Sequence, residues 1–363
     1  MTACRSPRLR FGVLGCGRMG QRHAYNIAYL TPRAELSAIC DPHPEALKWV
    51  PDNISSNIRV CTDPEDIFND AEIDAVVIAT VTSTHSSLAI RAIQAGKHVL
   101  LEKPISTDIE SARPVVEAAE AHPQLKVMIG FCRRFDPSYH EAKDRILSGF
   151  VGLPYLVKAT TSDLFDNSGF FVNYARHSGG IFNDAAVHDI DISRWLLSVD
   201  DTTKLANPRK QVRTVYGTGS VVRHPELAEF GDCDTALGII AYENGTQCSI
   251  HIARTATHGF ECFCEILGTS SKMIINGNPA KSRVEIRDQH GVRMESHQSW
   301  LDRLAEAFLL EIQDFTACVL DDTKIPATAR DGLEAAKIAM ALTHSLHTGK
   351  VVEFDEEGEP IIV

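Results

Sequence analysis

The stretch Phe-Gly-Val-Leu-Gly-Cys-Gly-Arg-Met-Gly at residues 11–20 decides the fold of the first part of this chain. Its apolar beginning, Phe11–Leu14, predicts a buried strand, and the glycines that follow fill a G-x-G-x-x-G pattern. Gly15 allows the tight turn out of the strand, and Gly17 leaves room for a pyrophosphate to approach the backbone. Gly20 lets the next helix pack close to the strand. The pattern therefore predicts a strand, a phosphate-binding turn and a helix.

A carboxylate at the end of the next strand strengthens this prediction. We expect a helix over roughly residues 21–29, whose N-terminal amides point at the phosphates, and a second strand over Glu35–Cys40. Asp41 follows that strand about 20 residues after Gly20, which is the spacing of a carboxylate that binds the ribose hydroxyls of a dinucleotide. The combination favours a dinucleotide site over an ordinary strand-to-helix turn.

The same carboxylate predicts NAD rather than NADP as the cofactor. Asp41 would repel a 2′-phosphate, and Pro42-His43-Pro44 offers no arginine to hold one. The residues expected to contact the cofactor in this region are Gly15, Cys16, Gly17, Arg18, Met19, Gly20 and Asp41.

Composition excludes several classes of function. The 363 residues are 44% apolar and 23% charged, as in a globular protein long enough for two domains. A net charge of −12 without a long basic run argues against nucleic acid or an anionic membrane as the main partner. No apolar stretch is long enough to span a bilayer, and no apolar segment of a secretory signal follows Arg5, Arg8 and Arg10. We therefore expect a cytoplasmic protein that binds neither nucleic acid nor membrane.

The ten cysteines show no C-x-x-C motif and no cysteine and histidine cluster with the spacing of a zinc site. Cys262 and Cys264 alternate in an expected strand, so their thiols share one face, where two buried apolar residues are favoured over a redox pair. Unpaired thiols in this number are typical of a reducing compartment. We expect no metal site.

Strand and helix alternate over roughly the first 130 residues. The continuously apolar Ala75–Ala79 has the composition of a strand buried on both faces, as in a parallel sheet. Such alternation predicts an α/β Rossmann dinucleotide-binding domain over residues 1–130, with helices on both faces of the sheet. The expected strands are Phe11–Leu14, Leu36–Cys40, Arg59–Cys61, Ala75–Ala79, His98–Leu101 and Lys126–Gly130, with Ser86–Gln94 and Ser111–Ala121 among the helices.

After about Phe150, strands follow one another with little helix between them. Asn244-Gly245 between two of them is a strong hairpin signal. This texture predicts an α+β domain over residues 131–363 with a large, mainly antiparallel open sheet. The expected strands are Tyr155–Ser162, Val212–Val222, Thr235–Tyr242, Gln247–Thr255, Glu261–Leu267, Lys272–Asn276 and Val284–Arg287, and the helices are Phe182–Leu197, Trp300–Leu320 and Arg330–His347.

Lys103 stands at the carboxyl end of an expected strand, in Leu100-Leu101-Glu102-Lys103-Pro104. Ligands of open α/β sheets bind at these strand ends, so the ammonium group can point at a substrate beside the nicotinamide. Pro104 fixes the backbone here, and the Lys103–Pro104 bond can be cis. The alternative is a surface lysine in a turn.

A second candidate group lies in the expected helix Phe182–Leu197. Asp184, His188 and Asp191 are spaced i, i+4 and i+7 and would form one stripe on that helix. A histidine with a carboxylate one turn away can act as a general base toward a hydroxyl. One alternative is a solvated helix face, and another is a metal site, for which the spacing supplies no third ligand.

Two weaker signals remain. Arg133-Arg134 follows the last strand of the first domain and favours pairing with carboxylates over binding of a ligand anion. Thr80 and His85 follow the Ala75–Ala79 strand, where a loop would border the nicotinamide ribose. His85 is thus either a helix cap or a cofactor contact.

In order along the chain, these segments resemble the Gfo/Idh/MocA oxidoreductase family, named after glucose–fructose oxidoreductase and inositol dehydrogenase. The likeness spans nearly the whole chain, and the ordered set of motifs is highly specific to the family. The motifs are residues 15–20 with His23, Glu102-Lys103-Pro104, Gly130-Phe131 with Arg133–Asp136, Gly179-Gly180 through Asp184, His188 and Asp191, and Arg330–Ala335 through Ser345, Thr348 and Gly349.

The resemblance implies oxidation of a secondary hydroxyl on a sugar or cyclitol with NAD or NADP, or the reverse reduction. It also implies an open sheet that often makes oligomer contacts, and hence a homo-oligomer, either a dimer or a tetramer. By resemblance, Lys103 is the active-site lysine, Asp184 and His188 match the aspartate and histidine of the inositol dehydrogenase triad, and Asp191 matches a substrate contact. The remaining residues expected at the site are Asn167 for the substrate and Thr80, His85, Glu102 and Lys103 for the cofactor.

The chain departs from familiar members at two positions that bear on the substrate. Ser162 stands where many members have a basic residue before the aspartate, and Phe260 stands where inositol dehydrogenases tend to have a tyrosine.

We therefore predict an NAD-dependent dehydrogenase of a polyhydroxylated ring, with activity similar to that of inositol 2-dehydrogenase. Lys103 would donate to the substrate oxygen, His188 would take the hydroxyl proton, and Asp184 would orient His188. One rival is a reductase of a ketone or imine with the same fold. Another is a non-catalytic NAD(H)-binding regulator, which would have no need of this set of residues.

Overall fold

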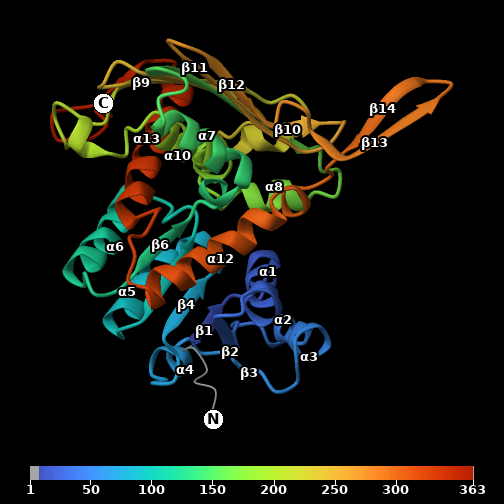
Figure 1. The fold of residues 1–363 in the computed structure, drawn as a ribbon, viewed down its shortest axis with the longest axis vertical. Helices are drawn as coiled ribbons and strands as arrows, with labels where there is room; N and C mark the ends of the chain where they lie inside the picture. The colour runs from blue at the N-terminus through green and yellow to red at the C-terminus, as the bar shows by residue number, and fades with distance from the viewer. Residues whose placement is uncertain (1–7, 363) are drawn as a thin grey trace. The chain divides into compact units, whose positions relative to one another are not determined.

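The computed structural model describes residues 8–362, which form two compact units. The first unit contains residues 8–135 together with Glu306–Leu333 (Figure 1). The second contains Asp136–Ala305 and the chain from Glu334 onward. This division differs from the expected domains, 1–130 and 131–363, chiefly because residues 306–333 belong to the first unit. Cys4 and Arg5 lie outside the described residues.

The first unit is built on a six-stranded parallel sheet in the order β3-β2-β1-β4-β5-β6. The order runs outward in both directions from the β1–β4 pair, which is the doubly wound topology predicted for a Rossmann domain. All of β4 is buried, as expected for a parallel strand covered on both faces. The strands are β1 (Leu9–Leu14), β2 (Ala34–Cys40), β3 (Arg59–Cys61), β4 (Ala75–Ile78), β5 (His98–Glu102) and β6 (Val127–Gly130).

The helices of this unit follow the predicted alternation. The helix expected over residues 21–29 begins earlier, at Arg18, and its second half is a π-helix. The helical segments are α1 (Arg18–Tyr25), the π-helix Asn26–Leu30, α2 (Pro44–Leu47), α3 (Trp49–Asn53), α4 (Glu65–Phe68), α5 (His85–Gln94), α6 (Ile109–Ala121) and α12 (Ala305–Leu320), with short 3-10 turns at Thr82–Thr84 and Cys132–Phe135.

Residues 306–333 complete the first unit although they are far along the chain. The ring centroids of Phe315 on α12 and Phe11 on β1 lie 6.0 Å apart. After α12, the N–H of Ile129 on β6 donates to the carbonyl oxygen of Ala327 at 2.9 Å. These contacts add a helix and an extended segment to the cover of the sheet.

Arg134 has the structural role predicted for it. Its Nη1 donates to the carbonyl oxygen of Pro326 at 2.6 Å, and its Nη2 lies 3.3 Å from Asp331 Oδ1. The side chain is buried, so this pairing ties the end of the first domain to the returning segment.

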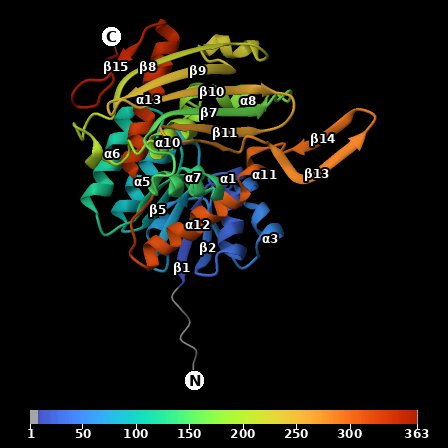
Figure 2. The same ribbon diagram turned by 45° about the horizontal axis from the view of Figure 1, so that its top comes forward.

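The second unit is built on a seven-stranded sheet in the order β12-β11-β7-β10-β9-β8-β15 (Figure 2). Neighbouring strands are antiparallel except for β7 and β10, which are parallel, so the prediction of a mainly antiparallel sheet is confirmed. The strands are β7 (Pro154–Leu164), β8 (Val212–Ser220), β9 (Thr235–Tyr242), β10 (Gln247–Ala256), β11 (Glu261–Gly268), β12 (Lys272–Ile275) and β15 (Val352–Glu353).

Helices cover one face of this sheet. α10 packs against β7 and β10, and α13 approaches β8 at Leu342. A Cβ on Gly217 of β8 would lie 2.5 Å from the carbonyl oxygen of Leu342, so only glycine fits at this crossing. The helices are α7 (Pro137–Leu147), α8 (Phe170–Ala175), α9 (Gly180–Asp184), α10 (Val187–Leu196), α11 (Trp300–Arg303) and α13 (Ala329–Thr348), with 3-10 turns at Thr202–Lys204 and Pro225–Phe230.

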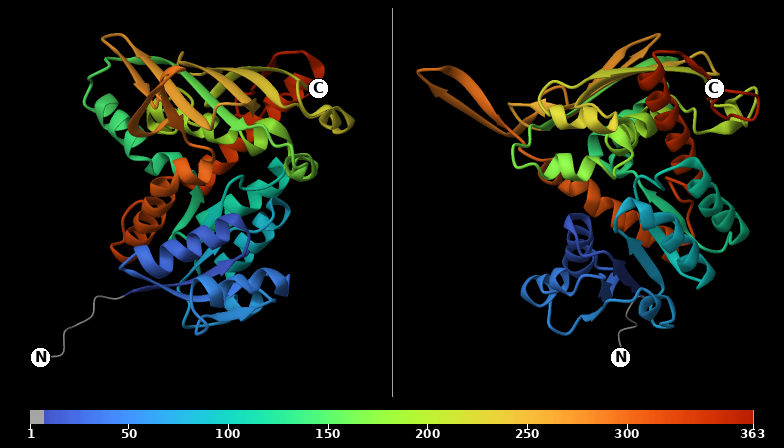
Figure 3. Two further views of the ribbon diagram at one scale, coloured as in Figure 1. Left: turned by 90° about the vertical axis from the view of Figure 1, so that its right-hand side faces the viewer. Right: turned by 180° about the vertical axis from the view of Figure 1, so that it is seen from behind.

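A separate two-stranded hairpin of β13 (Ala280–Asp288) and β14 (Gly291–Ser296) projects from this unit (Figure 3). The sequence analysis identified only Val284–Arg287 of it. Nearly every residue of both strands is exposed, so the hairpin lacks the alternation of buried and exposed residues that reveals a strand in a sequence.

The cysteines behave as expected from the sequence. The nine described cysteines are free thiols, and Cys262 and Cys264 are both buried on one face of β11. Across residues 8–362, no helix is both long enough and apolar enough for a transmembrane span.

Candidate active site

The glycine-rich turn has the geometry that its sequence predicts. Gly15 has a φ of +95°, and a Cβ there would lie 2.4 Å from the carbonyl oxygen of Ala79. Gly20 packs on the same turn, because its Cβ would lie 1.9 Å from the carbonyl oxygen of Gly15. At Gly17, the N-cap of α1, a Cβ would meet no described atom within 4 Å beyond its chain neighbours. The turn is therefore closed on the protein side and open where a phosphate would approach.

Asp41 lies against this turn at the end of β2. Its Oδ2 accepts the N–H of Cys16 at 2.8 Å, and its Oδ1 accepts the N–H of His43 at 2.9 Å. Each carboxylate oxygen can accept a further hydrogen bond, so these contacts orient Asp41 and leave it able to accept hydrogen bonds from a ligand. Burial, helped by the charge of Asp41, raises the pKa of the Cys16 thiol to about 11, so this thiol stays protonated. The ribose contact of Asp41 stays a prediction.

The loop after β4 is linked to the loop after β5 by His85. The ring Nδ1 of His85 lies 2.8 Å from the carbonyl oxygen of Pro104, and its Nε2 lies 3.2 Å from that of Thr80. Burial lowers the pKa of His85, which keeps the ring neutral. His85 is the first residue of α5 and contacts the loops that follow β4 and β5, at the sheet edge where ligands of such sheets bind. The cofactor contacts of His85 and Thr80 stay predictions.

Lys103 follows β5 directly, as predicted, and the Lys103–Pro104 peptide bond is cis. Its side chain is half-buried. The carboxylate of Glu102 next to it accepts the backbone N–H of Lys103 on Oε2 at 3.2 Å, and its Oε1 lies 2.7 Å from His23 Nε2. Glu102 therefore connects Lys103 to α1.

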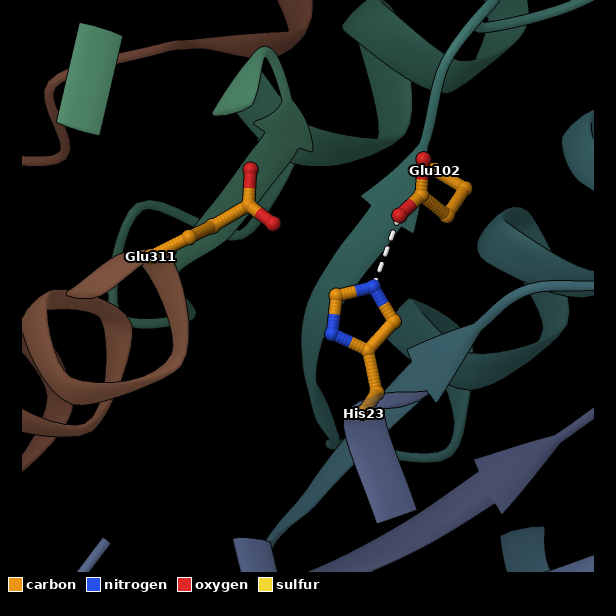
Figure 4. Close-up of side chains that lie close together, drawn as sticks. All are labelled: His23, Glu102 and Glu311. Carbon is orange, nitrogen blue, oxygen red and sulfur yellow. Dashed lines mark hydrogen bonds and ion pairs between the residues drawn. The ribbon is translucent and has the colours of Figure 1, made fainter. Parts of the chain in front are cut away.

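His23, Glu102 and Glu311 come together in the interior of the first unit (Figure 4). One ligand atom of each lies within 4.8 Å of the others. The sequence analysis missed this group because its members come from α1, β5 and α12, and no motif relates them. Imidazole and carboxylate are ligand types that a divalent cation accepts, so the group is also a candidate metal site.

In the second unit, Asp184 at the end of α9 lies in a cluster of polar side chains. Its Oδ1 accepts the hydroxyl of Tyr174 at 2.8 Å, and its Oδ2 pairs with Arg254 Nη2. Arg254 Nη1 also lies 3.4 Å from Asp163 Oδ2, and its guanidinium lies 4.3 Å from the ring centroid of Phe171. The carboxylate of Asp184 is thus buried, and the Arg254 guanidinium compensates its negative charge.

Arg254 is a site residue that the sequence analysis missed. Burial lowers its pKa, but the carboxylates of Asp184 and Asp163 raise the pKa further, so the guanidinium stays charged. The available signal was a single arginine near the end of the strand Gln247–Ala256. No spacing rule connects that position to Asp184.

The expected single helix Phe182–Leu197 is wrong, because the structure divides it. α9 ends at Asp184 and α10 begins at Val187. The N–H groups of Ala185 and Ala186 both donate to the carbonyl oxygen of Ile181, at 3.1 Å each, so the regular hydrogen-bond register of one helix is interrupted between them. Asp184 therefore does not share a helical stripe with His188 and Asp191.

The other predicted substrate residues lie on α10 and on the loop after β7. His188 is half-buried in the first turn of α10. Asp191 is buried one turn later, with Oδ1 3.7 Å from Arg194 Nη1. Asn167 is exposed in the loop. Their substrate contacts stay predictions.

The parallel doubly wound sheet and its open glycine turn place the protein in the class of dinucleotide-binding proteins. A separate α+β unit contains the buried cluster of Asp184, Arg254 and Tyr174. The chain belongs to the Gfo/Idh/MocA oxidoreductase family. The family model for the NAD-binding Rossmann fold of this oxidoreductase family matches residues 9–131. The model for the family's C-terminal alpha/beta domain matches residues 143–354. The predicted family and fold class are thereby confirmed.

Similar proteins extend over almost the whole chain. A scyllo-inositol 2-dehydrogenase (NAD(+)) of Bacillus subtilis is 32% identical over 351 residues, covering 96% of this chain and 97% of that protein. A myo-inositol 2-dehydrogenase of Thermotoga maritima is 28% identical and covers 96% of this chain and 99% of its own.

Among solved structures, a scyllo-inositol dehydrogenase of Lactobacillus casei with bound NAD(H) and scyllo-inositol superposes with a TM-score of 0.88. It is 32% identical, and the match covers 95% of this chain and 99% of that one. The protein is an enzyme of the NAD-dependent dehydrogenase class, as predicted.

Proposed function

We propose that this protein is an inositol 2-dehydrogenase, which oxidises a secondary ring hydroxyl of a cyclitol with NAD. The observation that carries the proposal is the similarity, over 95% of the chain, to an inositol dehydrogenase whose structure contains both NAD(H) and scyllo-inositol. The open glycine turn and the polar cluster around Asp184 are what such a reaction requires of each unit.

The first unit fits NAD. The space beside Gly17 would admit the pyrophosphate, and residues 15–20 with the N-terminus of α1 would hold it through backbone amides. Asp41 would accept the ribose hydroxyls and repel a 2′-phosphate. Bound NAD would supply the hydride acceptor at C4 of its nicotinamide.

The remaining roles belong to three side chains. Lys103 donates a hydrogen bond to the reacting oxygen and stabilises the negative charge that develops there. His188 accepts the hydroxyl proton. Asp184 orients His188, and since Arg254 compensates its charge, we expect Asp184 to act mainly through geometry.

The preference among cyclitols is set by residues near Asp163. Phe260 is buried, and its phenyl ring has no hydroxyl, so this position offers no side-chain hydrogen bond to a ligand. Ser162 supplies no charge, but Arg254 places a cation beside Asp163. A polyhydroxylated ring suits this polar cluster.

Turnover of a substrate panel tests the proposal. Wild-type protein is incubated with NAD and, separately, with myo-inositol, scyllo-inositol and several aldoses, and NADH is followed by absorbance. We expect the highest kcat/KM with an inositol. A second set of reactions contains NADH with ketones or imines, and NADH consumption there, without polyol oxidation in the first set, would favour the reductase. Tight NAD binding without turnover of any compound would favour the regulator.

We also propose that the protein is a cytoplasmic homo-oligomer that associates through the open face of the seven-stranded sheet. Tyr216, Leu237 and Ile239 on the adjacent strands β8 and β9 are exposed there, and exposed apolar groups of this kind mark association surfaces. Free thiols at all nine described cysteines suit a reducing compartment. Sedimentation of wild type and of Leu237→Glu tests the interface, with dissociation expected for the variant.

A further inference from the structure

The carboxylate of Glu102 lies between two hydrogen-bond donors. His23 Nε2 is 2.7 Å from Oε1, and the backbone N–H of Lys103 donates to Oε2 at 3.2 Å. His23 is fully buried and Glu102 nearly so. The one carboxylate therefore holds the backbone of Lys103 against α1, at the point where the lysine leaves the sheet.

The neighbouring strand approaches this carboxylate closely. Gly130 on β6 pairs with Glu102 on β5, and a Cβ at Gly130 would lie 3.2 Å from Oε2 and 3.3 Å from Glu102 Cδ. Such distances are shorter than ordinary van der Waals contact. Glycine at this position thus makes the space that Glu102 occupies.

Glu311 faces the same pair from α12 (Figure 4). It is fully buried, and neither of its carboxylate oxygens has a hydrogen-bond partner among residues 8–362. An ionised carboxylate in such surroundings carries a large desolvation penalty. Burial, together with the charge of Glu102, raises the pKa of Glu311 well above its usual range.

Two titratable groups near the cluster carry no positive charge. Cys132 is fully buried, and burial, with the charges of Glu311 and Glu102, raises the pKa of its thiol. His85 is kept neutral by burial, which lowers its pKa. Lys103 and Arg133 act on the Cys132 thiol more weakly than the two carboxylates. A neutral carboxylic acid at Glu311 is the form that fits.

A bound cation is the competing explanation, but the distances favour hydrogen bonding. Bonds of about 2.0–2.2 Å in a tetrahedral zinc site keep the ligand atoms roughly 3.4 Å apart. His23 Nε2 and Glu102 Oε1 are 2.7 Å apart, which is the length of a charge-assisted hydrogen bond.

We propose that Glu102 is a positioning residue for Lys103 rather than a cofactor ligand, that His23 holds the Glu102 carboxylate by a hydrogen bond, and that Glu311 fills the space beside this pair. Glu102 was expected from the sequence to contact the cofactor. A cofactor ligand and a residue that positions Lys103 predict opposite effects of substitution on NAD binding and on turnover. The proposal rests on the proposed function only in that Lys103 is taken as the residue that contacts substrate.

Glu102→Gln separates the two roles. An amide of the same size cannot accept hydrogen bonds on both sides, so either His23 or the Lys103 N–H loses its acceptor. We expect kcat to fall at least tenfold while the Kd for NAD, measured by calorimetry, stays within a factor of two. A tenfold rise in the Kd with unchanged kcat would show that Glu102 is a cofactor ligand. Glu120→Gln, at an exposed glutamate of the same unit, is the matched control.

A spectroscopic readout makes the test independent of turnover. Lysines are reductively ¹³C-methylated, and the signal of Lys103 is assigned with Lys103→Arg. Glu102→Gln should shift that signal while Glu120→Gln leaves it in place. If no inositol is oxidised but the signal shifts, the proposed function fails and the support of Lys103 stands. If inositols are oxidised and the signal does not shift, the reverse holds.

Gly130→Ala is the second variant in case Glu102→Gln does not fold. It leaves every hydrogen-bonding group present and crowds both the carboxylate and the Cα of Glu102. We expect a smaller fall in kcat, again with the Kd for NAD within a factor of two. A Gly130→Ala protein with native kcat would contradict the proposal.

Glu311 is tested by a pair of substitutions. Glu311→Ala should lower kcat and shift the Lys103 signal, and Glu311→Gln, the neutral isostere, should restore most of both. The metal content of wild type is measured after addition of Zn²⁺ or Mn²⁺ and gel filtration. One tightly bound ion per chain, lost in Glu311→Gln, would overturn the proposal in favour of a metal site.

Discussion

The nucleotide turn of the first unit is formed by backbone groups, whereas the Asp184 cluster of the second unit is formed by side chains. Residues 15–20 make their site with backbone amides and missing side chains, and Asp41 contacts them through the N–H of Cys16. The Asp184 cluster is made by side chains from β7, α8, α9 and β10, and its Arg254–Asp163 contact spans 91 residues of chain.

This difference explains which effects mutations should have. A backbone site tolerates changes in other side chains, whereas a buried set of charges depends on every member. Changes in the second unit should therefore reduce turnover or stability and leave NAD affinity nearly unchanged. Changes at Asp41 should weaken NAD binding and have little effect on stability.

The largest expected effect is on turnover in His188→Ala. Removing a positioned general base should lower kcat by a factor of roughly 10²–10⁴. An imidazole must be neutral to accept a proton, so wild-type oxidation should fall on acidification, and this acidic limb should flatten in the variant. Steady-state kinetics across pH, with the Kd for NAD measured in parallel, provides the check. A variant with the native rate and the native acidic limb would remove His188 from the reaction.

The next effect is on stability in Arg254→Met. The side chains of Asp184 and Arg254 are 6% and 13% exposed, so the substitution leaves a buried carboxylate without its cation. Loss of one partner of such a pair costs roughly 3–5 kcal/mol of unfolding free energy. Denaturant unfolding measures it.

Arg176→Met is the matched control for this substitution. Arg176 and Glu229 form a pair in the same unit, 3.6 Å apart, whose side chains are 47% and 68% exposed. An exposed pair of this kind contributes about 0–1 kcal/mol. Equal destabilisation by the two substitutions would mean that the Asp184 cluster is not the buried ionic network described above.

A smaller effect is expected from Asp41→Ala. Loss of hydrogen bonds from a charged acceptor weakens binding by about 1.5–3 kcal/mol, so the Kd for NAD should rise roughly tenfold or more. The preference for NAD over NADP should shrink at the same time, because the negative charge is gone. Calorimetry and kcat/KM with each cofactor give both numbers. Wild-type protein that used NADP as well as NAD would contradict the assignment of Asp41.

The smallest effect is a change in the pH dependence of stability in Glu311→Gln. An unfolded glutamate has a pKa of about 4.3, and burial raises the pKa of Glu311 in the folded state. The stability that protonation confers is therefore complete below about pH 4.3 and is lost as the pH rises toward the raised pKa. Glutamine does not ionise, so the variant does not lose this stability. The Tm of the variant should therefore increase relative to the Tm of wild type as pH rises. A constant difference in Tm would show that Glu311 is ionised.

Local signals made most of the fold predictable. The strand expected over Thr235–Tyr242 has the same bounds as β9, and Asn244-Gly245 forms the expected turn, with Gly245 at a φ of +84°. The glycine turn was predictable from the spacing of its three glycines after a strand, although the backbone atom that crowds Gly15 belongs to the distant Ala79.

The unpredicted features depend on distant residues or lack a local signal. Ala185-Ala186 contains no helix breaker, so nothing in the sequence marks the end of α9. The return of residues 306–333 to the first unit and the grouping of Glu311 with His23 arise only when the sheet is assembled. Backbone-determined sites are thus readable from a sequence, and side-chain clusters of high sequence separation are not.

Direct transfer of the substrate hydrogen is the most direct test of the central claim. Inositol deuterated at its ring carbons is oxidised with unlabelled NAD, and the reduced cofactor is analysed by mass spectrometry. The account predicts one deuterium in each molecule of reduced cofactor and a slower reaction than with unlabelled inositol. Reduced cofactor without deuterium, or none with any inositol, would contradict it.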